Sequence, residues 1–241
     1  MGTRRWHPGA PCAGCPGLAD IQLVYSSPYP SIWEYAESVQ AGAVDVSAYV
    51  GVVCPICGTS CGYRPIPAYR RGVIELFPVY RKGAVLVARA QCRRTLRTFS
   101  LLPHQLAPYH RYTVDSMVSA VVLAWGLSQE QGRPRREKPL DELPADCDVT
   151  LWLLSCWVQV LGQGLRGAHP VLCGWHDLSA VRSGTRLADE LREVAQYLGA
   201  LGARGPPRIE GIDEVLLHYG SRTGRFLIGT ASQDRRRRLA A

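Results

Sequence analysis

Two cysteine-bearing stretches decide the fold of this chain: Cys54-Pro55-Ile56-Cys57-Gly58 and Cys92-Arg93-Arg94-Thr95. Two apolar, β-rich runs lie between them, Val73–Tyr80 and Ala84–Ala90, and Arg81-Lys82-Gly83 separates the two runs. Apolar runs on either side of a short glycine-containing turn predict a β-hairpin. A Cys-x-x-Cys turn, a hairpin and a returning cysteine follow one another as in a zinc ribbon. We therefore expect a small zinc-ribbon-like β-hairpin domain.

The cysteines of these stretches indicate a metal site. A structural Zn²⁺ site takes four nitrogen or sulfur ligands in a tetrahedron. Cys54 and Cys57 are spaced to hold one ion, Gly58 permits the tight turn, and Cys92 can return as a third ligand. The expected partner of Cys92 is at position 95, where the chain has Thr95. Because a neutral hydroxyl is a poor zinc ligand, the identity of the fourth ligand stays open.

Several residues could complete this site. Cys61 follows the first pair closely and is the first candidate, while His104, or Cys12 with Cys15, are the alternatives. The predicted metal ligands are thus Cys54, Cys57, Cys92 and Cys61. Two other interpretations are a ribbon that has lost its metal and a redox Cys-x-x-Cys pair. The loop-like sequence after the first pair argues against the redox pair, because such motifs precede a helix N-terminus that lowers the thiol pKa.

The charge of the chain is concentrated in one segment. The 241 residues carry a net charge of +8, and residues 54–112 alone hold 10 basic residues and 1 acidic residue. So dense a positive charge predicts a polyanionic partner. Arginine predominates in the segment, and its planar guanidinium suits bidentate contact with phosphate. We predict DNA as the partner, bound by Arg70, Arg71, Arg81, Lys82, Arg93, Arg94 and Arg97; the alternative is a solvated basic surface.

The remainder of the chain predicts helices. Ser31 and Glu34 form a capping box for a short helix over residues 31–41. Apolar residues recur at helical spacing over Val114–Gly126, Val149–Leu161, Thr185–Leu201 and Ile212–Tyr219. The predicted class is therefore α+β, with the ribbon-like domain followed by an all-α region. We divide the chain into an extended lead with a short helix (1–49), the basic ribbon-like domain and connector (50–112), a helical domain (113–231) and a basic tail (232–241).

Several classes of protein are excluded or disfavoured. No run reaches the ~18 uninterrupted apolar residues of a membrane span, and residues 1–20 lack the apolar core of a signal peptide. Nine cysteines in such a chain predict a reducing, cytoplasmic location. Glycine-rich phosphate loops and common hydrolase motifs are absent, which disfavours an enzyme. His169, Cys173 and His176 have ligand-like spacing, but Pro170 and Gly174 predict a loop there.

Residues from Cys54 to Trp125 resemble an uncharacterised family of bacterial proteins with a zinc-ribbon-like domain of unknown function, related in appearance to transposase-associated proteins. The resemblance rests on the cysteine stretches and, above all, on Arg97–Pro103 and Pro108–Thr113. It implies a cytoplasmic bacterial protein of mobile-element type that contacts DNA, and it supplies no catalytic residue. Thr95 departs from the family pattern of a second Cys-x-x-Cys. We therefore expect a non-catalytic DNA-binding protein; the alternative is a protein-interaction scaffold with a vestigial, metal-free ribbon that binds a partner through its helices.

Overall fold

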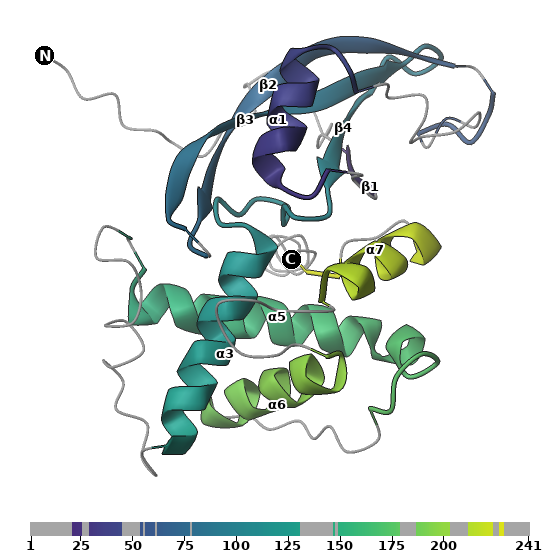
Figure 1. The fold of residues 1–241 in the computed structure, drawn as a ribbon. Helices are drawn as coiled ribbons and strands as arrows, with labels where there is room; N and C mark the ends of the chain where they lie inside the picture. Colours follow the sequence, from purple (N-terminus) through teal and green to yellow (C-terminus); the bar gives the residue numbers. More distant parts are fainter. Residues whose placement is uncertain are drawn as a thin grey trace, which may run out of the picture.

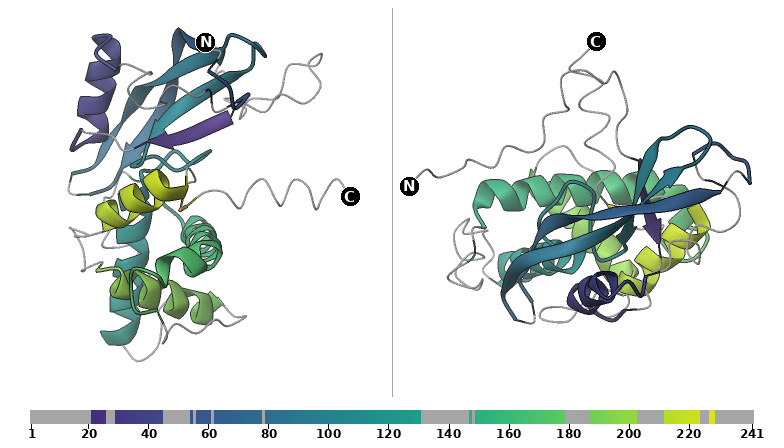
Figure 2. Two further views of the ribbon diagram at one scale, coloured as in Figure 1. Left: turned by 90° about the vertical axis from the view of Figure 1, so that its right-hand side faces the viewer. Right: turned by 90° about the horizontal axis from the view of Figure 1, so that it is seen from above.

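The computed structural model describes residues 21–25, 29–44, 54, 56–60, 62–77, 79–130, 147, 149–178, 187–202, 212–223 and 227–228. These residues form two stacked layers, a curved sheet with one helix and a group of four longer helices (Figure 1). The left view of Figure 2 shows the same two layers from the side. The expected α+β class is confirmed.

The sheet has four strands in the order β1-β4-β3-β2. Three of them, β2 (Tyr63–Glu75), β3 (Arg81–Cys92) and β4 (Thr98–Pro103), are antiparallel neighbours. β1 (Ile21–Tyr25) pairs in parallel with β4, although it comes from a region expected to be an extended lead. The connector expected after the ribbon likewise begins as a strand, β4, because its apolar residues complete the sheet core.

The predicted positions of the hairpin strands were wrong at the turn. Arg81 and Lys82, expected in the turn, are the first residues of β3 and lie opposite Glu75 and Ile74. The opposed charges of Arg81 and Glu75 favour this register. Leu76 lies beyond the end of β2 and is buried in the core of the helical layer. The last part of the Val73–Tyr80 run therefore packs against the helical layer and does not extend the strand.

Helix α1 (Ile32–Gln40) lies against the sheet. The predicted cap is present, because the Ser31 hydroxyl accepts a hydrogen bond from the Glu34 amide and lies 3.2 Å from its carboxylate. Tyr35 is fully buried beneath the helix. Its hydroxyl accepts a hydrogen bond from the Ala88 amide and donates one to the Leu101 carbonyl, so this residue joins α1 to β3 and β4.

The second layer contains α3 (Val114–Glu130), α5 (Leu151–Leu172), α6 (Leu187–Ala200) and α7 (Ile212–Thr223). All four were expected, but α3 continues past Gly126, and α5 continues past the expected end of its helix through Pro170. The loop expected from Pro170 and Gly174 therefore begins later than predicted, with the turn that follows Leu172 and contains Gly174. A proline in the last turn removes one hydrogen bond, while the buried face of Leu161, Leu165, Ala168 and Leu172 continues at helical spacing.

The end of β2 fixes the sheet to the helices. The amide of Ile74 donates to the carbonyl of Arg111 (2.8 Å), and the amide of Thr113 donates to the carbonyl of Ile74 (3.0 Å). The Leu76 amide donates to the Ser116 hydroxyl on α3 (2.8 Å). Three hydrogen bonds thus join the hairpin to the start of α3. Among the described helices, none is long and apolar enough to cross a membrane.

Candidate metal centre and basic knuckle

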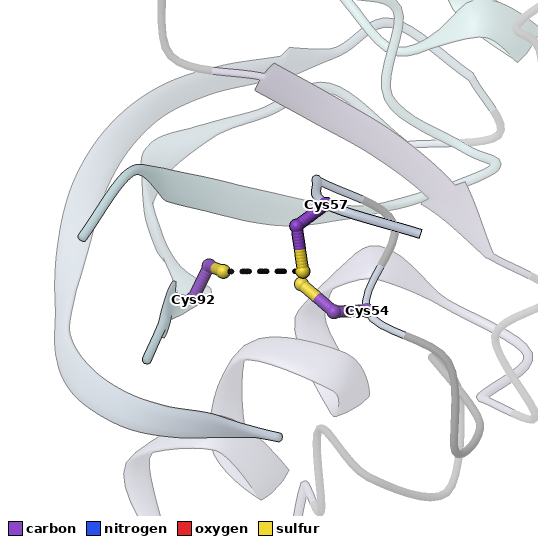
Figure 3. A group of neighbouring side chains, drawn as sticks. All are labelled: Cys54, Cys57 and Cys92. Atoms are coloured by element: carbon purple, nitrogen blue, oxygen red, sulfur yellow. Dashed lines mark hydrogen bonds between the residues drawn. The ribbon is translucent and has the colours of Figure 1, made fainter. Parts of the chain in front are cut away.

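Three thiols from two separate parts of the sequence, residues 54–57 and residue 92, converge beside the sheet (Figure 3). The sulfur atoms of Cys54, Cys57 and Cys92 all lie within 4.8 Å of one another. The Cys57 and Cys92 sulfurs are 3.7 Å apart, and none of the three residues forms a disulfide. Cys54 and Cys92 are fully buried, and Cys57 is half-buried. These thiols could together hold a metal ion.

The first two thiols belong to a tight turn over residues 54–59, which we call the first knuckle. The Cys54 amide donates to the Thr59 carbonyl (2.9 Å), and the Gly58 amide donates to the Cys54 carbonyl (2.8 Å). Gly58 has a φ of +67°, a conformation that glycine adopts without a steric penalty. This glycine reverses the chain, so the first knuckle places Cys54 and Cys57 on one side of the turn.

Residues 92–97 repeat this turn, and we call them the second knuckle. The Cys92 amide donates to the Arg97 carbonyl (2.9 Å), and the Leu96 amide donates to the Cys92 carbonyl (2.9 Å). Leu96 has a φ of +58° and stands where the first knuckle has its glycine. By the same correspondence Thr95 stands where the first knuckle has Cys57. Thr95, where the sequence pattern expects a fourth cysteine, therefore occupies the position of a ligand in a turn that the structure repeats.

Hydrogen bonds and burial act in opposite directions on the two buried thiols. Burial raises the pKa of Cys54, and hydrogen bonds from the amides of Cys57 and Ile56 partly oppose it. At Cys92 the hydrogen bond from the Thr95 side chain is the largest effect, and together with the Thr95 amide it lowers the pKa to about 6. This lowered pKa favours the thiolate of Cys92, the form that binds metals.

The other candidate ligands from the sequence are Cys61, His104, Cys12 and Cys15. Cys61, Cys12 and Cys15 lie outside the described residues. His104 is buried near the end of β4 and does not join the three thiols in the described cluster. Thr95 lies against the site, with its amide 3.4 Å from the Cys92 sulfur.

The predicted phosphate-binding residues occupy two regions. Arg93, Arg94 and Arg97 lie on the second knuckle, and the first two are exposed. Within the described part of the chain, no carboxylate pairs with either exposed side chain. Arg70 and Lys82 are exposed farther along the hairpin.

Two of the predicted phosphate ligands also have contacts within the fold. The guanidinium of Arg71 donates to the backbone carbonyls of Ala107 and His110, which ties β2 to the segment before α3. Burial lowers the pKa of Arg71. Arg81 lies over the ring of Trp33 on α1, with its guanidinium carbon 4.8 Å from the ring centroid. The carbonyl contacts tie Arg71 to the fold, whereas Arg81 stays exposed beside Trp33.

Sequence reasoning missed one basic residue beside the second knuckle. Arg64 on β2 donates two hydrogen bonds to the Gln91 carboxamide, at 2.9 and 2.6 Å. Gln91 in turn donates to the Leu96 carbonyl (2.8 Å). Arg64 was not distinguishable in the sequence from other strand arginines, because its proximity depends on the register that places it opposite Gln91.

The second possible cluster in the sequence is divided between different environments. His169 lies on α5 with its Nδ1 atom 2.7 Å from the Tyr197 hydroxyl on α6. Cys173 is exposed just after the helix. Among the described residues these side chains do not form a group suited to a metal ion.

Comparison of the whole chain with protein-family models, with curated proteins and with solved structures found no match.

Proposed function

We propose that this chain is a DNA-binding protein in which a zinc ion, held by Cys54, Cys57 and Cys92, shapes a basic turn that contacts phosphates. The observation that carries the proposal is the display of Arg93 and Arg94 on the second knuckle. Both side chains are exposed, and no carboxylate in the described part of the chain neutralises them. The turn that carries them begins at a metal-competent thiol.

Zinc fits the sulfur geometry. With zinc–sulfur bonds of about 2.3 Å, two ligands of a tetrahedral site have their sulfurs about 3.8 Å apart. The observed separation of the Cys57 and Cys92 sulfurs is 3.7 Å. An all-thiol donor set also favours zinc or another thiophilic metal over magnesium or calcium. The free thiols suit a reducing compartment, so we assign the protein to the cytoplasm.

The metal would act through the backbone. It would hold the two knuckles together, and the second knuckle then presents its arginines from a fixed turn. Arginine binds phosphate through two parallel hydrogen bonds and retains its charge at every physiological pH. Phosphate contacts of this kind position a protein on DNA without reading its sequence. The proposal is thus for sequence-tolerant binding without chemistry on the DNA, in a mobile-element context that rests on the family resemblance.

The salt dependence of DNA binding tests this function. We would follow binding to a labelled duplex of about 20 base pairs by fluorescence anisotropy across a range of salt concentrations. For B-DNA the slope of log affinity against log salt is about 0.9 per phosphate neutralised. Because log affinity falls as log salt rises, the slope of the double variant Arg93→Gln/Arg94→Gln should be smaller in magnitude by about 2. The matched control is Arg192→Gln/Arg222→Gln, which removes two exposed arginines from α6 and α7.

The control variant should retain the slope of the native protein. If the native protein does not bind duplex DNA, or if the two double variants behave alike, the assignment of DNA binding to the second knuckle is wrong.

A second function has one observation in its favour. Trp152, near the start of α5, is 75% exposed, and exposed tryptophan is common at protein interfaces. If the chain is instead a protein-interaction scaffold, Trp152→Ala should abolish partner capture while the arginine variant retains it. Trp157, on the same helix, is fully buried and packs against Tyr112, so it contributes to the core.

A further inference from the structure

The tip of the second knuckle has an unusual residue. Leu96 adopts a φ of +58°, and its side chain is 65% exposed. The equivalent residue of the first knuckle is Gly58. A bulky side chain in the left-handed region is uncommon, because its Cβ is crowded by the backbone. This leucine therefore strains the turn and contributes little to the core, which indicates a function outside the fold.

The surroundings of Leu96 make the tip rigid and basic. Gln91 holds the Leu96 carbonyl, and Arg64 holds Gln91 in turn. The Leu96 amide is bound by the Cys92 carbonyl within the knuckle. Exposed Arg93 and Arg94 precede the tip. An exposed apolar side chain thus lies on a braced turn that also carries Arg93, Arg94 and Arg97.

We propose that Leu96 is a wedge that inserts between stacked base pairs from the minor groove of duplex DNA and bends the duplex. The inference rests on the proposed DNA binding and adds a mode to it. Proteins that bend DNA in this way insert an apolar side chain at a base step while basic residues hold the flanking backbone. Arginines are also attracted to a narrow minor groove, where the negative potential is strongest.

The charge around the tip favours DNA over a protein partner. An apolar contact residue in a protein interface is surrounded by other apolar or neutral groups, and charged residues are depleted at the interface centre. Leu96 instead lies among the arginines of its own turn, with Arg64 held nearby. A stacked base step flanked by phosphates offers both an apolar surface and anions.

Ring closure of short DNA tests the wedge. Duplexes of about 120 base pairs are shorter than the persistence length of ~150 base pairs and are circularised slowly by ligase unless a protein bends them. The native protein should accelerate ring closure. Leu96→Gly should lose this effect and bind linear duplex about tenfold more weakly, because base-step insertion is lost. Its salt slope should stay unchanged, because the phosphate contacts remain.

Two further variants separate the wedge from a structural effect. Val79→Gly removes another side chain that is 65% exposed, from the far end of the hairpin, and should bend DNA like the native protein. Leu96→Asn retains a side chain that tolerates the left-handed region but is polar, and should fail to bend it. Both Leu96 variants should be at least as heat-stable as the native protein, since strain is relieved.

The outcomes distinguish the two proposals. If the native protein does not bind DNA at all, the proposed function fails together with the wedge. If it binds DNA with an arginine-dependent salt slope but Leu96→Gly still accelerates ring closure, only the wedge is wrong. Loss of DNA bending together with a lower melting temperature in both Leu96 variants would assign Leu96 to folding and would likewise overturn the wedge.

Discussion

Thr95→Cys should convert the duplicated turn into a complete four-thiolate site. Thr95 occupies the place in the second knuckle that Cys57 occupies in the first. Cys57 reaches within 3.7 Å of the Cys92 sulfur from that place. A cysteine at position 95 should therefore direct its sulfur toward the same centre, without a change in the backbone.

The expected gain follows from the energy of structural zinc sites. Apparent binding free energies are about 10–16 kcal/mol for four ligands, or about 3 kcal/mol per ligand. A fourth thiolate should thus raise zinc affinity by about 100-fold at neutral pH. The substitution also removes the Thr95 hydroxyl whose hydrogen bond lowers the pKa of Cys92. Because the pKa of Cys92 then rises, protons compete better for this thiolate, and the gain should shrink as the pH falls toward 6.

The assay is competition for zinc against a chromogenic chelator, with zinc stoichiometry measured by elemental analysis. We would introduce Thr95→Cys both into the native chain and into Cys61→Ser, so that Cys61 cannot supply the fourth ligand. Arg94→Cys is the matched control, because it adds a thiol to the same turn at a position equivalent to Ile56, which is not a ligand. Equal affinities for the Thr95→Cys and Arg94→Cys proteins in the Cys61→Ser background would refute the equivalence of the two knuckles.

Two other predictions concern the helical layer. An added Cβ at Gly164 would overlap the backbone carbonyl of Leu227, so Gly164→Ala should destabilise the protein by about 1–3 kcal/mol. An added Cβ at Gly167 would have no atom within contact distance among the described residues, so Gly167→Ala should stabilise the helix by up to about 1 kcal/mol. Urea unfolding measures both, and similar values would contradict the close approach at Gly164. Burial raises the pKa of Glu193, so the folded protein favours the protonated carboxyl. This group therefore stabilises the fold at pH values below the ordinary glutamate pKa. That contribution should be lost as the pH rises through the raised pKa. Glu193→Gln should remove that part of the pH dependence of the unfolding free energy, and an unaltered profile would show that another group causes it.

Local patterns predicted most of the elements but not their ends. Ser31 and Glu34 were sufficient to predict the start of α1, because capping depends on neighbouring residues. Pro170 suggested a loop, yet α5 continues through it because the apolar face beyond is buried against other helices. β1 had no recognisable signal, since its partner β4 is remote in sequence and parallel pairing leaves no local pattern.

The candidate site was predictable in its chemistry and not in its shape. Cys54, Cys57 and Cys92 were predictable because ligand spacing is a property of sequence, and the described geometry brings all three together. The departure at Thr95 was also visible. The left-handed backbone of Leu96 was not, because nothing in the residue type predicts that a leucine will adopt a conformation that favours glycine. Arg71 resembled its exposed neighbours in sequence, and only tertiary contacts distinguish it.

The parallel pairing of β1 with β4 has a consequence for how the protein is made on the ribosome. β1 leaves the exit tunnel first, but Phe99 and the other partners on β4 follow only after the entire hairpin. β1 also contacts α7, the last described helix. β1 therefore lacks one or both of these neighbours until β4 and α7 have been synthesised, and unpaired strand edges invite association with other chains during that interval. Nascent chains stalled before α7 should accordingly depend on chaperones more than the released protein does.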